Sequence, residues 1–210
     1  MKLILATNNA HKAREFREIL GNRFDDLVTL REAGIEHETV EDGVTFAENA
    51  LKKAREICEM TGCAAIADDS GLCVDALDGE PGILSARYAS LDGKDASDRA
   101  NLDLLKRNME GVENRAARYV CAIALVLPDG RVFQTEDTFD GEIGVEEKGQ
   151  NGFGYDPIFY VPAYGTTAAD MAPELKNSLS HRGKALRAME AKLADEAMFG
   201  AGKTPEKEET

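Results

Sequence analysis

Short apolar runs alternate with longer segments in which apolar residues recur every three or four positions. The run Lys2–Ala6 predicts a buried strand, and the helical spacing over Ala10–Leu20 predicts a helix after it. A Thr-x-x-Glu capping box at residues 45–48 opens a second helix, which is expected to reach about Met60. Strand and helix signals that alternate in this way are typical of an α/β fold.

The pattern changes where two acidic residues follow an apolar run. Residues 63–67 predict a short strand that ends at Asp68 and Asp69. Gly71 then predicts a turn, and residues 72–74 form a second short apolar run. We therefore expect the two carboxylates to lie at the end of a strand.

The second half of the chain begins with a helix predicted over residues 97–109. A hairpin is predicted next, with strands over Ala117–Leu127 and Arg131–Thr138 joined by a Pro-Asp-Gly turn. The last predicted helix has Ser180 as its N-cap and runs to about Phe199.

Length and composition limit the number of domains. The chain has 210 residues, of which 43% are hydrophobic, and it shows neither an internal repeat nor a linker. We expect one α/β domain with a mixed β-sheet over residues 1–199. Residues 200–210 are polar and are expected to form a disordered tail.

No apolar segment has the length of a transmembrane span or the pattern of a signal peptide, so we expect no membrane association. The cysteines lack zinc-ligand spacing and lie in apolar stretches, which favours buried, reduced thiols in a cytoplasmic protein. These residues are Cys58, Cys63, Cys73 and Cys121.

The net charge of −14 argues against nucleic-acid binding, because a phosphate backbone would be repelled. Acidic residues are dense between Phe24 and Asn49, where Arg31 is the only arginine or lysine. A solvated acidic face explains most of this segment, and a few of its carboxylates are candidates for holding a cation.

The Asp68-Asp69 pair is the first candidate for chemistry. Neighbouring carboxylates repel each other, so the pair requires a counter-charge from a metal ion, a lysine or water. A hard cation held at a strand end is a common means of binding phosphates.

A second candidate is the segment between the first strand and the first helix. It contains Thr7, Asn8, Asn9 and Lys12. Hydroxyl and amide side chains beside the backbone N–H groups of a helix N-terminus form an anion pocket, and the lysine adds a positive charge. Capping of the helix by Thr7 or Asn9 explains the same residues equally well.

Two further motifs lie in the second half. In the loop Gly152–Pro157, glycines allow the backbone to approach a flat ligand on which an aromatic ring stacks, although an aromatic plug of the core is the alternative. Lys176, His181 and Arg182 gather at the start of the last helix, where the helix dipole disfavours positive charge. This local conflict indicates a functional site with an anion or acceptor opposite.

Taken together and in this order, the motifs resemble the inosine triphosphate pyrophosphatase family, whose members act on XTP, dITP and other non-standard purine nucleoside triphosphates. The resemblance extends from Met1 to about Phe199 and includes the connecting pieces 45–50 and 81–88. The motifs that carry it are Thr7-x-Asn9-x-x-Lys12, Ala67–Gly71, Gly152–Pro157 and Ser180–Arg182.

The resemblance implies an elongated fold with two lobes around an active-site cleft, a homodimer, and Mg²⁺-dependent hydrolysis of the triphosphate to a monophosphate and pyrophosphate. It implies that Asp69 is the catalytic carboxylate and a magnesium ligand, that Glu41 is a second ligand, and that Ser70 contacts substrate. The residues implied to face the triphosphate are Thr7, Asn8, Asn9, Lys12 and Lys53.

At the other end of the substrate, the resemblance implies that Phe153 stacks on the base. Gly154, Tyr155 and Asp156 would form the pocket wall, and Lys176, His181 and Arg182 would contact the nucleotide. Donors from His181 and Arg182 favour a keto oxygen at position 6 of the purine and would be left unsatisfied by the amino group of adenine.

Two other interpretations remain open at this point. One is a related pyrophosphatase for modified pyrimidine nucleotides of the Maf-like type, which shares a Thr-x-Asn opening, although the Ser-His-Arg segment and the aromatic loop argue against it. The other is a nucleotide-binding protein without catalytic activity, although every polar motif position holds a competent residue.

Overall fold

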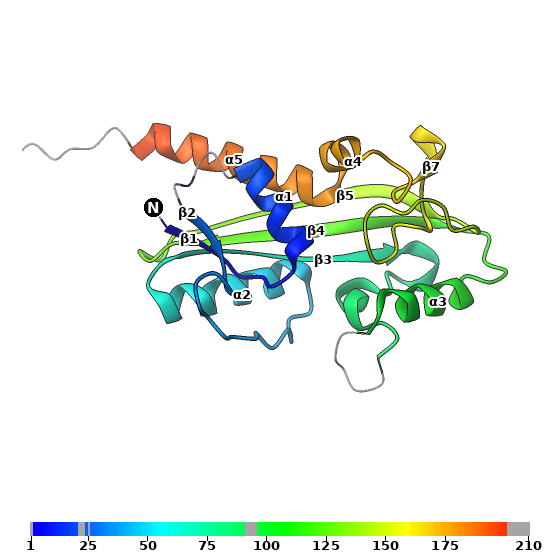
Figure 1. Cartoon of the computed structure of the whole chain (residues 1–210), viewed down its shortest axis with the longest axis horizontal. Coiled ribbons are helices and arrows are strands. Elements are labelled where there is room, and N and C mark those ends of the chain that lie inside the picture. Colours follow the sequence, from blue (N-terminus) through cyan, green and yellow to red (C-terminus); the bar gives the residue numbers. More distant parts are fainter. Residues whose placement is uncertain (1, 21–23, 25, 91–95, 201–210) are drawn as a thin grey trace, which may run out of the picture.

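The computed structural model describes residues 2–20, 24, 26–90 and 96–200. Within them, long strands run the length of an elongated molecule and helices cover both faces of the sheet (Figure 1). The strands are β1 (Lys2–Leu5), β2 (Asp26–Thr29), β3 (Ala64–Val74), β4 (Ala116–Val126), β5 (Val132–Ile143), β6 (Phe159–Val161) and β7 (Thr166–Thr167). The helices are α1 (Ala10–Leu20), α2 (Phe46–Thr61), α3 (Asp98–Asn108), α4 (Pro173–Leu179) and α5 (His181–Gly200), with 3-10 segments η1 (Asp75–Leu77), η2 (Gly82–Arg87) and η3 (Pro162–Tyr164).

The sheet is mixed, with the strand order β2-β1-β3-β4-β5-β6-β7. β2, β1 and β3 are parallel, and every later pairing is antiparallel. α1, α4 and α5 lie on one side of the long strands, whereas α2 and α3 lie on the other (Figure 1). The expected α/β class with a central mixed sheet is confirmed.

The predicted helix ends agree with the observed caps. The Thr45 hydroxyl accepts a hydrogen bond from the Glu48 amide, and Gly62 closes α2 in the left-handed conformation at φ 63°. Ser97 caps α3 through its hydroxyl in the same way. α4 was not predicted, because it is short and its N-cap, Ala172, offers no capping side chain.

The turn predicted at Gly71 is wrong. β3 continues through both aspartates and the glycine as one strand, paired with β4 from Ala65 to Val74. Gly71 remains in the strand because a Cβ atom there would collide with the carbonyl oxygen of Gly82, so the glycine admits η2 against the sheet. The aspartates therefore lie in the middle of a strand rather than at its end.

The hairpin is confirmed, but its second strand is longer than predicted. β5 extends to Ile143 because residues 139–142 continue the pairing with β4, and its last two residues also pair with β6, a strand too short to be recognised from sequence. The four cysteines are free thiols, as expected. Cys58 and Cys121 are buried, whereas Cys63 and Cys73 are only half-buried.

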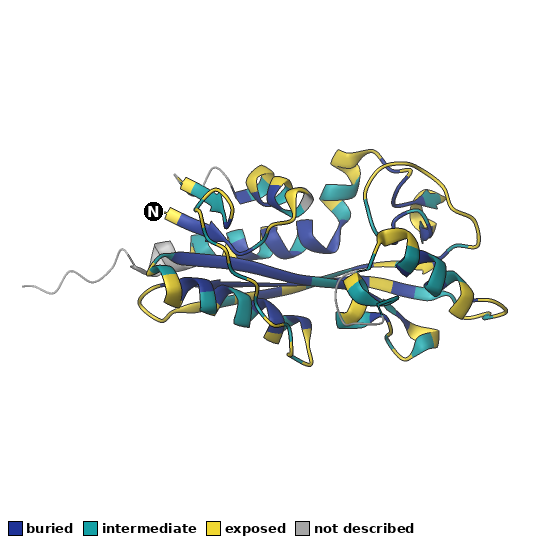
Figure 2. Cartoon of the chain, turned by 60° about the horizontal axis from the view of Figure 1, so that its bottom comes forward, coloured by how far each residue is buried: buried dark blue, intermediate teal, exposed yellow. Residues whose placement is uncertain are grey.

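Buried apolar side chains form three clusters that account for two lobes. One cluster lies between the sheet and α1 and α5, and a second lies between the sheet and α2. The third surrounds the far ends of β3, β4 and β5 together with α3 and β6. The long strands β3 and β4, which are mostly buried, therefore connect two packed regions (Figure 2).

Two further expectations concern the predicted C-terminal tail and the lack of membrane-spanning segments. Residues 201–210, which make up nearly all of the predicted tail, lie outside the described residues. Among the helices of the described part, none is both long and apolar enough to cross a membrane.

Candidate active site

A cavity of about 1140 Å³ opens where β1 ends and β3 continues past it. β1 pairs with only the first residues of β3, so the edge of β3 beyond Ile66 faces this cleft. In parallel α/β sheets, ligand sites form at such carboxyl ends of strands. All the residues predicted from the motifs line the cavity, namely Thr7, Asn8, Asn9, Lys12, Glu41, Lys53, Asp69, Ser70, Phe153, Gly154, Tyr155, Asp156, Lys176, His181 and Arg182.

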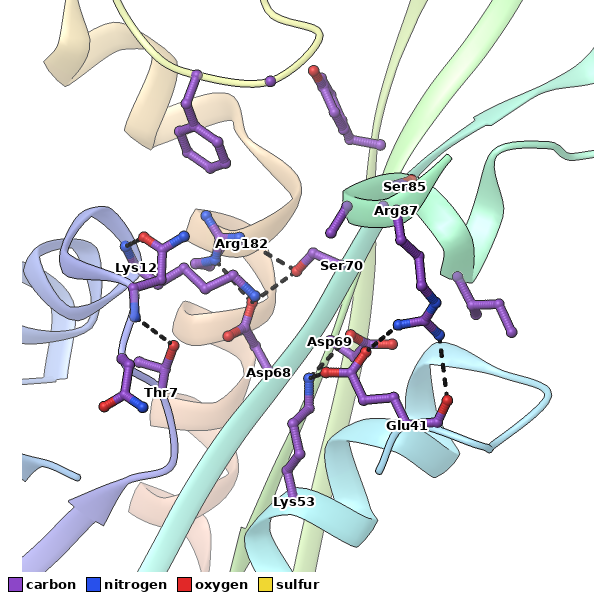
Figure 3. Close-up of a pocket in the computed structure, with 18 of the residues that line it drawn as sticks. Thr7, Lys12, Glu41, Lys53, Asp68, Asp69, Ser70, Ser85, Arg87 and Arg182 are labelled. Atoms are coloured by element: carbon purple, nitrogen blue, oxygen red, sulfur yellow. Dashed lines mark hydrogen bonds and ion pairs between the residues drawn. The ribbon is translucent and has the colours of Figure 1, made fainter. Parts of the chain in front are cut away.

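The loop before α1 caps its helix and also directs a lysine into the cleft. The Thr7 hydroxyl accepts from the Asn9 amide, and the Asn9 side chain accepts from the Lys12 amide. The capping that the sequence allowed is therefore present. Lys12 extends its ammonium group to Asp68, with Nζ 2.9 Å from Oδ2 (Figure 3).

Asp68 lies at the centre of a charged cluster on the side of the sheet that faces α1 and α5. Its Oδ2 atom also accepts from the Ser70 hydroxyl at 2.8 Å and from Arg182 Nε at 3.2 Å. Arg182 in turn donates to Glu15 on α1 at 2.6 Å. Although complete burial works in the opposite direction, the charges of Lys12, Arg182 and Lys53 hold the pKa of Asp68 far below its usual range.

Asp69 points to the opposite face of β3, toward α2, because successive side chains alternate along a strand. Lys53 Nζ lies 3.0 Å from Asp69 Oδ1 and 3.0 Å from Glu41 Oε1, so two carboxylates share one ammonium group. Asn49 donates to the other Asp69 oxygen at 3.2 Å. Burial and the nearby charge of Glu41 raise the pKa of Asp69, and Lys53 only partly offsets them.

The same two carboxylates suit a divalent cation. Their convergence on one ammonium group demonstrates that two hard oxygen donors face a single positively charged position. Among the described residues, no group of three or more histidine, cysteine or acidic side chains is placed to hold a metal. Mg²⁺ does not require such a cage, since one or two carboxylates together with substrate phosphates and water complete its shell.

At the other end of the cleft, the aromatic loop is organised by Asp156. Its Oδ2 atom accepts from the Phe153 amide at 2.9 Å and from Lys176 Nζ at 2.6 Å. Gly152 has a positive φ of 79°, and a Cβ atom there would overlap this carboxylate. Lys176 Nζ also lies 5.6 Å from the centre of the Phe153 ring. The loop thus places the Phe153 ring beside the Lys176 ammonium group, which Asp156 holds in position.

His181 and Arg182 begin α5, and the predicted conflict with the helix dipole is relieved in two ways. Arg182 is neutralised by Asp68 and Glu15. His181 is buried and stacks on Tyr119, with ring centres 4.9 Å apart. Burial, with the charges of Arg182 and Lys176, lowers the pKa of His181 well below its ordinary value, so the imidazole is neutral at pH 7. Its Nδ1 atom has no hydrogen-bond partner among the described residues.

Sequence reasoning missed four residues that shape this cleft. Asn49 and Arg87 lie in the connecting pieces 45–50 and 81–88 that resemble the family, but no role was predicted for any of the four. Glu15 and Asn49 lie on helices whose polar positions look like solvated surface, while Tyr119 lies in a strand that reads as core. The four are Glu15, Asn49, Arg87 and Tyr119.

The sequence is similar over most of its length to a known family and to several of its members. The family model described as the Ham1 family matches residues 3–192. The dITP/XTP pyrophosphatase of Desulforamulus reducens is 50% identical over 189 residues, covering 89% of this chain and 92% of that protein. The dITP/XTP pyrophosphatase of Exiguobacterium sibiricum is 46% identical over 195 residues, covering 92% and 97%.

Solved structures agree with these sequence matches. The Ham1 protein of Staphylococcus aureus superposes with a TM-score of 0.84 at 38% identity, covering 93% of this chain and all of that one. A nucleoside-triphosphatase, or dITP/XTP pyrophosphatase, from Mycobacterium abscessus has a TM-score of 0.74 at 43% identity, covering 90% and 98%. The resemblance drawn from the four motifs is confirmed, and the chain belongs to the Ham1 family.

Proposed function

We propose that this protein hydrolyses non-standard purine nucleoside triphosphates, namely dITP, ITP and XTP, to the monophosphate and pyrophosphate. This reaction removes them from the nucleotide pool and so keeps them out of DNA and RNA. The observation that carries the proposal is a single cleft with paired carboxylates and lysines at one end and an aromatic loop with neutral His181 at the other. Relatives of 46–50% identity that are named dITP/XTP pyrophosphatases support the same reaction.

The carboxylate end is suited to the α-phosphate. A water oxygen attacks the α-phosphorus, the bond from that phosphorus to the bridging oxygen breaks, and pyrophosphate leaves. Asp69 is proposed to orient the water and to accept its proton, because its carboxylate lines the cleft beside Lys53 and Glu41. Lys12 and Lys53 stabilise negative charge on the phosphates.

We propose Mg²⁺ as the cofactor, held by Asp69 and Glu41. When bound there, it would neutralise charge on the triphosphate and the leaving pyrophosphate. The supporting observation is the convergence of the two carboxylates on one cation position. Asn49 and Arg87 hold the carboxylate oxygens that Lys53 does not contact.

The aromatic end is suited to a purine that carries oxygen at position 6. Phe153 supplies a ring for stacking, and Gly154, Tyr155 and Asp156 form the wall. His181, neutral and buried, offers one N–H donor and one acceptor nitrogen. Three Arg182 nitrogens already donate to protein oxygens, which leaves it two further N–H donors. Adenine would leave such donors unpaired.

A pyrophosphate-release assay tests the proposal. With Mg²⁺ present, dITP and XTP should be cleaved far faster than dATP or dGTP. Equal rates for all four nucleotides would contradict the proposed specificity. Preference for dUTP or methylated pyrimidine triphosphates would favour the Maf-like alternative, and tight dITP binding without release would favour a protein that only binds nucleotides. We also propose that the protein is cytoplasmic and that it forms a homodimer. Sedimentation of the purified chain would test the homodimer.

A further inference from the structure

The proposed ligand Glu41 lies on a segment without regular structure. Residues 35–45, between β2 and α2, contain neither helix nor strand. Backbone of this kind has no ladder of hydrogen bonds to fix a carboxylate, so its position depends on contacts with other elements. The contacts that hold Glu41 therefore determine how well it can serve a cation.

Arg87 makes the most specific of these contacts. One guanidinium nitrogen lies 3.5 Å from Glu41 Oε2, and the other donates to the backbone carbonyl oxygen of Glu41 at 3.3 Å (Figure 3). A planar guanidinium fixes two donors in defined directions, so it restrains the side chain and the backbone of one residue together. It holds Oε2, whereas Lys53 contacts Oε1, so Arg87 can remain bound while Oε1 serves another cation.

The opposite side of this contact is firmly anchored. Arg87 ends η2, and Ser85 in η2 accepts from the Leu72 amide of β3 at 2.8 Å. Tyr155 donates to the Ser85 carbonyl oxygen at 2.8 Å, and buried Asn101 of α3 donates to the backbone of η2 at 3.0 Å. Contacts from β3, from Tyr155 and from α3 hold η2 in place. Arg87 therefore restrains the position of the loop that carries Glu41.

We propose that Arg87 is a positioning residue that holds Glu41 in the orientation from which it binds the divalent cation. The inference rests on the proposed role of Glu41 as a metal ligand. Partners that orient a ligand from outside its coordination shell commonly contribute ten-fold to hundred-fold to metal affinity. Loss of Arg87 should accordingly weaken cation binding even though Arg87 does not contact the cation.

The direct test is a titration of the metal-free protein with Mn²⁺, followed by electron paramagnetic resonance. Arg87→Gln should raise the dissociation constant about ten-fold or more, and Arg87→Lys, which keeps the charge but not the planar fork, should lie between it and the unmodified protein. Lys52→Gln is the matched control, because the Lys52–Asp42 pair at 2.6 Å joins α2 to the same loop on its exposed side. The Lys52→Gln substitution should change the Mn²⁺ dissociation constant by less than about two-fold.

Amide hydrogen exchange of the metal-free protein gives a second readout. The Gly43 amide donates to Asn49 at 2.8 Å, so its exchange reports whether the loop is held. Arg87→Gln should accelerate exchange over residues 40–44, and Lys52→Gln should not. In steady-state assays, excess Mg²⁺ should restore the kcat of Arg87→Gln, while the Mg²⁺ concentration needed for half-maximal rate rises about ten-fold.

Several outcomes would overturn the inference. Unchanged Mn²⁺ affinity in both Arg87 variants would do so, as would an equal loss in Lys52→Gln. Unchanged affinity in Glu41→Gln would remove the proposed ligand and, with it, the role of Arg87. The proposed reaction is judged separately, by pyrophosphate release from dITP with the unmodified protein, and it can stand when the positioning role fails.

Discussion

Asp68 and Asp69 are adjacent in β3, yet the two faces of the sheet give them opposite surroundings. On the face toward α1 and α5, Asp68 receives Lys12, Ser70 and Arg182, and its pKa falls far below the usual range. On the face toward α2, burial and the charge of Glu41 raise the pKa of Asp69, because Asp69 shares its one lysine with that second carboxylate. One strand therefore carries a carboxylate that faces two cations of its own and a carboxylate that shares a single ammonium group with Glu41.

The face of the strand on which a carboxylate lies decides whether it mainly stabilises the fold or takes part in chemistry. A buried carboxylate surrounded by cations mainly fixes those cations, and Asp68 thereby joins α1 and α5 to the sheet. A buried carboxylate beside another carboxylate remains poorly stabilised until a cation or a proton arrives. Groups of the second kind are the ones that serve as ligands and bases in active sites.

Substitution of Asp69 should change turnover more than any other substitution considered for this cleft. Asp69→Asn should lower kcat/KM for dITP by at least about 10³-fold, because a neutral amide neither accepts the proton of water nor binds a hard cation well. The free energy of unfolding should change by less than about 1 kcal/mol, since removal of this charge also relieves its repulsion with Glu41. Pyrophosphate release and urea unfolding measure the two quantities. Activity within ten-fold of normal would show that Asp69 is not the catalytic carboxylate.

The neighbouring substitution should act on stability instead. Asp68→Asn removes the carboxylate partner of Lys12 and leaves buried Arg182 with Glu15 alone, and the loss of one member of a buried pair costs about 3 kcal/mol. Urea unfolding of this variant beside Asp69→Asn compares the two faces directly. Equal stability of the two variants would show that Asp68 does not stabilise the fold more than Asp69 does.

The sequence predicted much of this arrangement and misplaced part of it. Capping residues and apolar spacing are local signals, so α1, α2, α3 and α5 were recovered nearly to their ends. The turn at Gly71 was wrong because the residue that requires a glycine there is Gly82, which is distant in sequence from the pattern being read. The roles of the motif residues were predicted, whereas those of Arg87, in the connecting piece 81–88, and of Tyr119 were not, because their contacts exist only after the chain has folded.

A smaller effect concerns pH and the neutral state of His181. The native pKa of this imidazole lies well below its ordinary value of 6.5, so the unfolded chain binds the extra proton first as the pH falls. The free energy of unfolding should therefore decrease from pH 7 to pH 5, at up to about 1.4 kcal/mol per pH unit from this one group. His181→Gln should reduce that slope, whereas His37→Gln, which removes an imidazole paired with Glu56 near the surface, should leave it in place. Equal slopes in the unmodified protein and His181→Gln would show that His181 is not held neutral.

A small effect is expected for Tyr119, which lies near the aromatic loop on the side of the sheet that faces α5. Tyr119 stacks on His181 and donates its hydroxyl to Asp156 Oδ1 at 3.2 Å, so it connects the start of α5 to the aromatic loop. Tyr119→Phe keeps the stacked ring but removes the hydrogen bond, and Asp156 retains its bonds from Phe153 and Lys176.

Because Asp156 keeps those two donors, the Phe variant should lose only about 1 kcal/mol of unfolding free energy. If Tyr119 orients the base pocket through Asp156, the ratio of kcat/KM for dITP to that for dGTP should fall about two-fold to five-fold, with KM for dITP affected more than kcat. Tyr88→Phe is a suitable control, since its hydroxyl bonds Glu80 and Asn108 away from Asp156. A variant that loses stability but keeps the nucleotide ratio would make Tyr119 a packing residue and confine base selection to the loop and the first turn of α5.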